Sequence, residues 1–231
     1  MTIRVLLADD QALLRATFRL LVDSAPDMEV VGEASDGAEA VEQARQSRAD
    51  VVVMDIRMPG VDGIEATRRI TADEDLAGVK ILVLTTFETD ELVAAALRAG
   101  ASGFLGKGVE PEALLQAVRT VSAGESLLSP TATTALIARF LAHPDPRTVD
   151  VAADLGRLTA REREITALAG RGLSNAEIAA EKFISEATAK THINRAMMKT
   201  GARDRAQLVV FAYETGLVTP GTGGHQPPPD R

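Results

Sequence analysis

Cysteine and tryptophan are absent from the 231 residues, and tyrosine occurs only once. Without cysteine the chain forms no disulfide, iron–sulfur cluster, thiolate zinc site or cysteine nucleophile, which fits a reducing compartment. We therefore expect any bound metal ion to be held by oxygen. The few aromatic rings also argue against a protein that binds RNA or single strands by base stacking.

Long apolar runs are absent as well. No stretch approaches the roughly 18 residues that a membrane span needs, and Asp9 and Asp10 interrupt the start before a signal-peptide core develops. We therefore expect a cytoplasmic protein with no membrane partner. Apolar residues make up 45% and charged residues 25%, as in ordinary globular proteins, and the length favours two modest domains.

The formal net charge of −8 is unevenly distributed. Residues 1–125 contain 12 basic and 22 acidic side chains, a net charge of −10, whereas residues 126–231 contain 13 and 11, a net charge of +2. Within residues 157–205 the balance is 10 against 6, or +4. An acidic half joined to a mildly basic half indicates a different partner for each.

The first half alternates two kinds of segment. Apolar runs that are typical of strands occur at 3–8, 29–34, 51–54, 81–84 and 103–105, and helix-like stretches occur at about 11–23, 37–47, 62–72, 89–99 and 111–123. Nearly continuous Val, Ile and Leu in three of the runs indicates strands buried on both faces. The pattern predicts an α/β doubly wound domain with a five-stranded parallel sheet over residues 1–125.

The pattern loosens in the middle of the chain. Pro144, Asp145 and Pro146 are turn residues, and we place a linker at 126–156, with a possible helix at 130–142. The last residues, 219–231, are rich in proline and glycine and are expected to be disordered.

Residues 157–218 contain only helical patterns and predict a small all-α domain. Capping boxes mark two helix starts, and Gly201 suits a helix end; the boxes pair Thr159 with Glu162 and Ser174 with Glu177.

Five polar side chains follow the predicted strands of the first half: Asp9, Asp10, Asp55, Thr85 and Lys107. Because ligands of open parallel sheets lie beyond the carboxyl ends of the strands, these side chains should meet at one edge. Three carboxylates repel one another unless a cation joins them, which predicts a hard divalent ion, most simply Mg2+. A carboxylate there can attack a phosphoryl group while Lys107 holds a phosphoryl oxygen.

Residues 1–125 resemble the receiver domain of bacterial response regulators, which has a flavodoxin-like fold. The resemblance is carried by the Asp9-Asp10 pair, the run MDIRMPGVDG at 54–63, Thr85, and the run GASGF at 100–104 followed by Lys107. It implies that a sensor histidine kinase phosphorylates Asp55. It also implies that Mg2+ is bound by Asp10, Asp55 and the main-chain carbonyl of Arg57 with support from Asp9, and that Thr85 and Phe104 form the switch pair.

One helix of the second half has the pattern of a DNA-contacting helix. Between Ser185 as N-cap and Gly201, one face has four small or apolar residues directed inward: Ala189, Ile193, Ala196 and Thr200. The opposite face carries side chains that can enter a major groove: Ala187, Lys190, Thr191, Asn194, Met198 and, at its margin, Arg195. The pattern alone is equally compatible with a solvent-exposed face of a helical bundle.

Residues 157–218 resemble the LuxR/NarL-type helix-turn-helix module through the run LTAREREITALAGRGLSNAEIAAEKFISEATAKTH. The resemblance places Lys190, Thr191 and Asn194 at base-contacting positions and implies a fourth helix, from Arg203 to about Thr215, that pairs two copies. Lys182 stands where leucine is usual, and smaller residues than usual stand at Ala189, Ala196 and Thr200. These departures predict a softer module with relaxed DNA affinity.

Together these patterns predict a transcriptional response regulator of the NarL/LuxR type. The acidic domain accepts a phosphoryl group and is a switch and not a turnover enzyme, and the basic domain binds operator DNA as a homodimer when phosphorylated. A phosphatase of the haloacid dehalogenase type would carry a second aspartate two residues after Asp55, but Arg57 occupies that position. A phosphorylation-controlled interaction protein with a weakened helix-turn-helix stays as the alternative.

Overall fold

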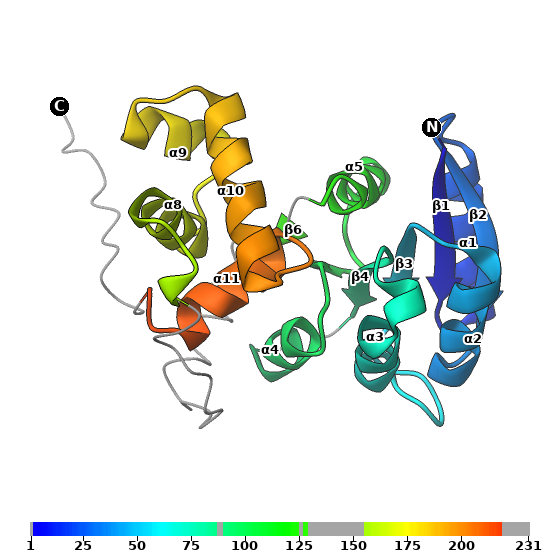
Figure 1. Cartoon of the computed structure of the whole chain (residues 1–231). Helices are drawn as coiled ribbons and strands as arrows, with labels where there is room; N and C mark the ends of the chain where they lie inside the picture. The colour runs from blue at the N-terminus through cyan, green and yellow to red at the C-terminus, as the bar shows by residue number, and fades with distance from the viewer. Residues whose placement is uncertain (1, 87–89, 125–126, 129–154, 219–231) are drawn as a thin grey trace, which may run out of the picture. The chain divides into compact units, whose positions relative to one another are not determined.

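A computed structural model describes residues 2–86, 90–124, 127–128 and 155–218 (Figure 1). The chain divides into two compact units, of which the first comprises residues 1–136 with the segment Arg203–Gln207 and the second comprises residues 137–202 and 208–231. Most of the predicted linker, with its possible helix at 130–142, and the predicted disordered tail at 219–231 lie outside the described residues.

The first unit contains a parallel sheet in the order β2-β1-β3-β4-β5-β6. Its strands are β1 Ile3–Ala8, β2 Met28–Ala34, β3 Val51–Met54, β4 Lys80–Thr85, β5 Gly103–Gly106 and β6 Leu127–Leu128. The first five confirm the predicted doubly wound domain. The two-residue β6, which pairs with β5 from Gly103 and Phe104, lies where the sequence predicted only a linker.

Five helices connect the strands: α1 Ala12–Asp23, α2 Gly37–Ser47, α3 Gly63–Ala72, α4 Asp90–Arg98 and α5 Pro111–Ser122. A short 3-10 turn, Glu74–Leu76, precedes β4. Asp36 and Asp62 start α2 and α3 by accepting hydrogen bonds from backbone N–H groups of the first turn. Pro111 occupies the first turn of α5, where its missing N–H costs nothing.

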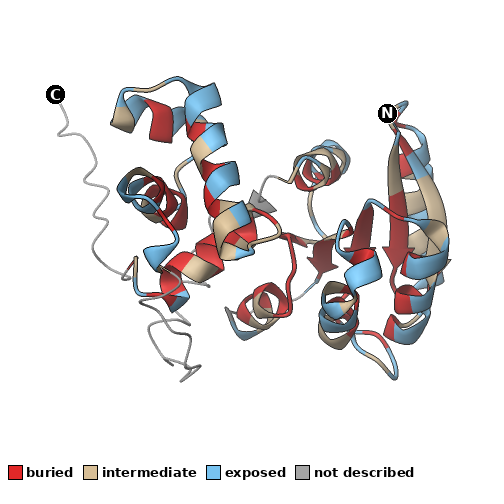
Figure 2. Ribbon diagram, viewed as in Figure 1, coloured by how far each residue is buried: buried red, intermediate tan, exposed pale blue. Residues whose placement is uncertain are grey.

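The central strands are buried on both faces, as Figure 2 shows for this unit. Alternate residues of β1, β3 and β4 pack with α1 and α5 in one core cluster, which includes Val5, Leu7, Val51, Val53, Leu82 and Leu84. The residues between them, such as Leu6, Val52 and Ile81, are equally buried and point the other way. Burial on two faces explains why these strands are runs of Val, Ile and Leu without polar alternation.

The second unit contains helices α8 Ala160–Gly170, α9 Asn175–Lys182 and α10 Glu186–Thr200, and most of α11 Arg205–Glu214. Both predicted capping boxes are present, at Thr159 and Ser174. Gly201 ends α10 in the left-handed conformation, with φ of 73°. The core joins one side of α8, α9, α10 and α11 and includes Ile165, Ile178, Ile193 and Leu208. No helix among the described residues is long and apolar enough to cross a membrane.

A buried carboxylate connects two helices of the second unit. Glu162 in the first turn of α8 is 3% exposed, and its Oε2 lies 2.6 Å from Lys199 Nζ near the end of α10. The same oxygen accepts the Thr159 backbone N–H at 2.8 Å. Burial acts to raise the pKa of Glu162, but the hydrogen bonds from Lys199 and Thr159 outweigh it and lower the pKa from 4.5 to about 2.

We expect Glu162→Gln to remove a pH-dependent contribution to the stability of the second unit. Because the folded pKa is depressed, this contribution is fully present above pH 4.5 and is lost as the pH falls toward 2. Its size should be about 1–2 kcal/mol, since solvent screens the partly exposed Lys199. Urea unfolding across this pH window, with hydrogen exchange of α8 and α10 amides, measures the effect.

Glu164→Gln is the matched control, because this neighbour on α8 is exposed and its pairs with Arg161 and Lys182 are at the surface. Equal losses for the two variants would show that the Glu162 ion pair does not stabilise the unit.

Candidate functional site

A cluster of carboxylates lies at the carboxyl ends of β1 and β3. One oxygen each from Asp9, Asp10 and Asp55 lies within 4.8 Å of the others. Asp9 and Asp55 are buried, whereas Asp10 is exposed. The two strands bring these residues together because Ala8 and Met54 are direct partners in the parallel ladder, so the next residues of both strands emerge at the same edge.

Lys107 bridges the two buried carboxylates. Its Nζ lies 2.6 Å from Asp9 Oδ2 and 2.9 Å from Asp55 Oδ2, and all three side chains are about 5% exposed. The Lys107 backbone is fixed as well, because its N–H donates to the carbonyl oxygen of Thr85 at 2.8 Å. The ammonium therefore lies within hydrogen-bond distance of the carboxylate that the sequence predicts to be the phosphoryl acceptor.

The electrostatics of this site are set by burial and by the ion pairs. Burial raises the pKa of Asp55 above its usual value and the charge of Asp9 adds to this, while Lys107 acts in the opposite direction. For Lys107, burial acts to lower the pKa, but the hydrogen bonds to Asp9 and Asp55 outweigh it and the pKa is raised. Lys107 is thus held in the charged form that an anionic ligand would meet.

The predicted switch residues lie on the two strands next to the cluster. Thr85 is the last residue of β4 and is 1% exposed, and Phe104 on β5 is also 1% exposed and pairs with Val83. Arg57 lies in the loop after β3 with an exposed side chain. The ligand role of its carbonyl and the movement of Thr85 and Phe104 stay predictions.

The loop from β3 to α3 packs tightly behind Asp55. The Gly63 N–H donates to the Ile56 carbonyl oxygen at 2.9 Å. A Cβ atom at Gly63 would lie 1.9 Å from the Asp55 carbonyl oxygen, far inside van der Waals contact. A second close contact holds the same loop, since the Gly37 N–H donates to the Val61 carbonyl oxygen at 2.9 Å. Glycine is therefore required at position 63 for the backbone of Asp55 to lie where it does.

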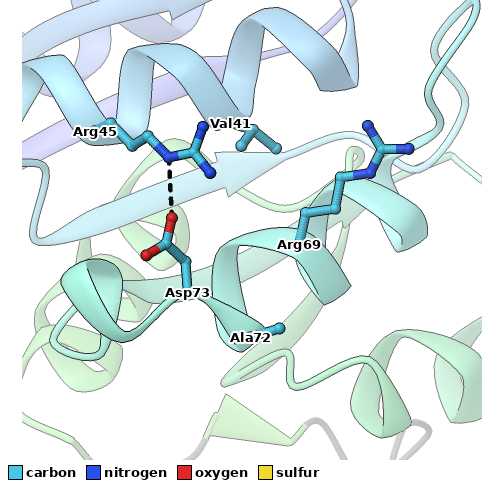
Figure 3. Close-up of a pocket in the computed structure, with 5 residues that line it drawn as sticks. All are labelled: Val41, Arg45, Arg69, Ala72 and Asp73. Carbon is cyan, nitrogen blue, oxygen red and sulfur yellow. Dashed lines mark hydrogen bonds and ion pairs between the residues drawn. The ribbon is translucent and has the colours of Figure 1, made fainter.

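A hollow of about 460 Å3 lies between α2 and α3, away from the carboxylate cluster. It is lined by Val41, Arg45, Arg69, Ala72 and Asp73 (Figure 3). Arg45 Nε is paired with Asp73 at 2.9 Å, and Arg69 Nε is paired with Glu65 at 2.9 Å. Because both guanidinium groups already have carboxylate partners, this hollow does not have the character of an anion site. None of the residues that the sequence singled out lines it.

The outer face of α10 carries the residues that the sequence assigned to DNA. Lys190, Thr191, Asn194 and Arg195 are all exposed. On the opposite face Ala189, Ile193 and Ala196 are buried, and Thr200 is half-buried. The predicted orientation of this helix is therefore confirmed. The Thr191 hydroxyl donates to the Ala187 carbonyl oxygen at 2.8 Å, so its methyl group and its oxygen lone pairs are what it can offer a base pair.

Lys182, which stands at a position predicted to face inward, is 24% exposed at its side chain. Its Nζ lies 3.5 Å from Glu164 Oε2, and its carbonyl oxygen accepts a hydrogen bond from Arg161 at 3.0 Å. The stem is thus partly buried while the ammonium reaches a partner at the surface.

The turn between α9 and α10 has an unusual residue at its centre. Phe183 ends α9 in the left-handed conformation, with φ of 53°. The Phe183 N–H bonds to the Ala180 carbonyl oxygen and the Ile184 N–H to the Ala179 carbonyl oxygen, which is the Schellman pattern that normally has glycine at this position. The left-handed conformation costs a non-glycine residue about 1–2 kcal/mol. Phe183 is 96% exposed.

Comparison with known families covers both units. Residues 5–119 match the response regulator receiver domain, and residues 156–212 match the bacterial regulatory proteins of the luxR family. The transcriptional regulatory protein YxjL of Bacillus subtilis is 41% identical over 217 residues, which are 94% of this chain and 97% of that protein. The chain belongs to the LuxR-type response regulators.

Other proteins similar to this response regulator are also transcriptional or response regulators. The transcriptional regulatory protein LiaR of Bacillus subtilis is 39% identical over 94% of this chain and 99% of that protein. The crystal structure of response regulator ChrA of a heme-sensing two-component system shares 39% identity over 94% of this chain and 99% of that one, with a TM-score of 0.51. A LuxR-family response regulator from Aurantimonas covers 61% of this chain and 99% of its own, at 35% identity and a TM-score of 0.56.

The predicted family, fold class and two-part function as a transcriptional response regulator are thereby confirmed. The sequence did not predict the close packing at Gly63, the pairing of Glu162 with Lys199, or the conformation of Phe183. Gly63 and Glu162 lay within motifs that the sequence did reveal, so a signal for them was present. Nothing in the apolar pattern distinguished Phe183, because its importance comes from its backbone conformation.

We expect Gly63→Ala to displace the backbone of Asp55. The added Cβ must push the Asp55 carbonyl away. This overpacking should destabilise the first unit by about 1–3 kcal/mol and should slow phosphoryl labelling. Urea unfolding and labelling by a small phosphodonor measure the two effects. Gly78→Ala is the control, because nothing lies within 4 Å of its Cβ position. Equal unfolding midpoints for the two variants would show that the loop rearranges around the added methyl group with no loss of stability.

Proposed function

We propose that Asp55 of this response regulator accepts a phosphoryl group from the phosphohistidine of a sensor kinase. An Asp55 carboxylate oxygen forms the new bond to phosphorus as the bond from phosphorus to the histidine nitrogen breaks, and the imidazole leaves. The observation that carries this proposal is the bridge from Lys107 to Asp55 and Asp9 at 2.9 and 2.6 Å. The transfer sets a switch in a cytoplasmic regulator and is not a turnover reaction.

We infer that the carboxylate cluster binds Mg2+ when phosphoryl transfer occurs. Its donors are oxygen atoms, as Mg2+ prefers, and three of them lie within 4.8 Å of one another. Asp10 and Asp55 are the proposed side-chain ligands, Arg57 contributes its main-chain carbonyl, and Asp9 supports the site. The ion supplies positive charge to the phosphoryl oxygens, while Lys107 binds one of them and Thr85 another.

We propose that the signal passes from the phosphoryl group to Thr85 and Phe104. The phosphoryl group brings close to two negative charges and new acceptors to the edge of the sheet. The hydroxyl of Thr85 at the end of β4 turns toward them, and the ring of Phe104 on the neighbouring strand responds. A local charge change thus biases a two-state surface around α4 and β5.

We propose that α10 enters the major groove of operator DNA, in a homodimer that forms when Asp55 is phosphorylated and that places two such helices on two half-sites. Lys190, Thr191 and Asn194 then contact base edges, and Arg195 contacts the backbone at the margin. The alternative, an interaction protein with a weakened helix-turn-helix, rested on Lys182 and Ala189. Lys182 is paired with Glu164 and Ala189 is fully buried, so these departures are accommodated and DNA binding is favoured.

We expect Asp55→Asn to abolish labelling when the full chain is incubated with acetyl phosphate and magnesium. The amide cannot form an acyl phosphate, so the hydroxylamine-labile modification should be missing. Asp75→Asn, which changes an exposed aspartate, is the control and should be labelled normally. Label that survives in Asp55→Asn would place the acceptor elsewhere.

We expect Lys190→Ala to weaken binding of operator DNA by about 1–3 kcal/mol if the ammonium contacts a base. Gel shifts over a series of salt concentrations measure the affinity and its salt dependence, because counterion release makes DNA binding steeply salt-dependent. Arg68→Ala removes one positive charge from the first unit and is the control. An affinity unchanged by Lys190→Ala would contradict the assigned contact.

A further inference from the structure

Phe183 combines three features that do not favour folding. It is a bulky residue in a left-handed backbone conformation, and it stands where glycine or asparagine is usual. The residue is 96% exposed, so its ring gains almost nothing from burial. A residue whose backbone is strained and whose side chain gains almost nothing from burial indicates a role in binding.

The other positive φ angles of the described chain lie at glycines, with one exception. Positive φ angles occur at six glycines: Gly60, Gly100, Gly124, Gly172, Gly201 and Gly216. Besides Phe183, the non-glycine residue in this region is Arg48, whose carbonyl oxygen accepts a hydrogen bond from Arg4 Nε at 3.2 Å. Arg48 has a polar side chain suited to the surface of the first unit, whereas Phe183 exposes an apolar ring.

The position of Phe183 in the turn indicates what the ring meets. Ser185, two residues later, caps α10 by accepting the Thr188 N–H at 3.1 Å, so Phe183 lies at the entrance to the helix that we assign to the major groove. In a helix-turn-helix the first helix crosses the DNA backbone and the second enters the groove with its amino-terminal residues. The connection between them therefore passes the sugar–phosphate wall of the groove.

We propose that Phe183 is a DNA-contacting residue whose ring packs on the C–H face of a deoxyribose at the edge of the major groove. This inference rests on the proposed DNA-binding function of α10. The left-handed backbone directs the ring outward from the domain, where glycine would leave a gap in the contact. Phe183 then contributes to affinity and to the depth at which α10 enters the groove, without neutralising a phosphate.

The test uses the full chain and a duplex selected from a randomised pool by the wild-type protein. Phe183→Gly and Phe183→Asn should raise the melting temperature of the second unit by a few degrees, because they relieve the backbone strain, and should weaken binding about tenfold, because the ring is lost. The slope of log Kd against log salt should stay unchanged, since no phosphate contact is removed. Phe183→Leu should bind with intermediate affinity and gain no stability.

Two further measurements make the assignment specific. Hydroxyl radicals attack deoxyribose C–H bonds, so footprints should show sugars at the groove edge that wild-type protein protects and Phe183→Gly does not. Arg48→Gly is the matched control. It relieves the backbone strain of a left-handed residue in the first unit and should leave DNA affinity unchanged.

Equal affinity and equal footprints for wild type and Phe183→Gly would overturn the inference and leave the DNA-binding function intact. The same holds if Phe183→Gly weakens only dimerisation, which would assign the ring to a second copy of the chain. Failure of wild-type protein to select any duplex would instead remove the DNA-binding function, and this inference with it.

Discussion

The chemistry of the first unit depends on one buried ammonium group. Lys107 joins Asp9 and Asp55, and without it two nearly inaccessible carboxylates would lie side by side in a site of low polarity, where their repulsion and desolvation would both be costly. The lysine comes from the far end of the unit in sequence, beyond β5. The site therefore exists only when β1, β3 and β5 have taken their places in one sheet, which couples the acceptor to the integrity of the whole fold.

The second unit also has a buried carboxylate in an ion pair, and this pair connects two helices. Glu162 and Lys199 connect the first turn of α8 to the last turn of α10, and the same carboxylate closes a capping box. One side chain thus caps the first turn of α8 and links that turn to the last turn of α10. The helix that carries the residues assigned to DNA is therefore held to α8 near its carboxyl-terminal end.

Much of the fold and of the carboxylate site could be predicted from the sequence. The first five strands were predicted to within a residue or so, because strands buried on both faces are continuous apolar runs, and the carboxyl-end rule brought Asp9, Asp55 and Lys107 together. The two faces of α10 followed from helical periodicity. The pairing of Lys107 with both carboxylates could not be predicted, since it depends on side-chain distances. The two residues of β6 are too few to form a pattern, and the backbone conformation of Phe183 leaves no trace in hydropathy.

The contact between Gly63 and the Asp55 carbonyl oxygen has a consequence for the position of the Asp55 carboxylate. With no room for even a methyl group there, any side chain at position 63 would have to move the main chain of Asp55. The place of that carboxylate therefore depends on the loop that leads to α3 as much as on the strand that carries it. A single hydrogen atom at position 63 is what allows the two segments to lie in contact.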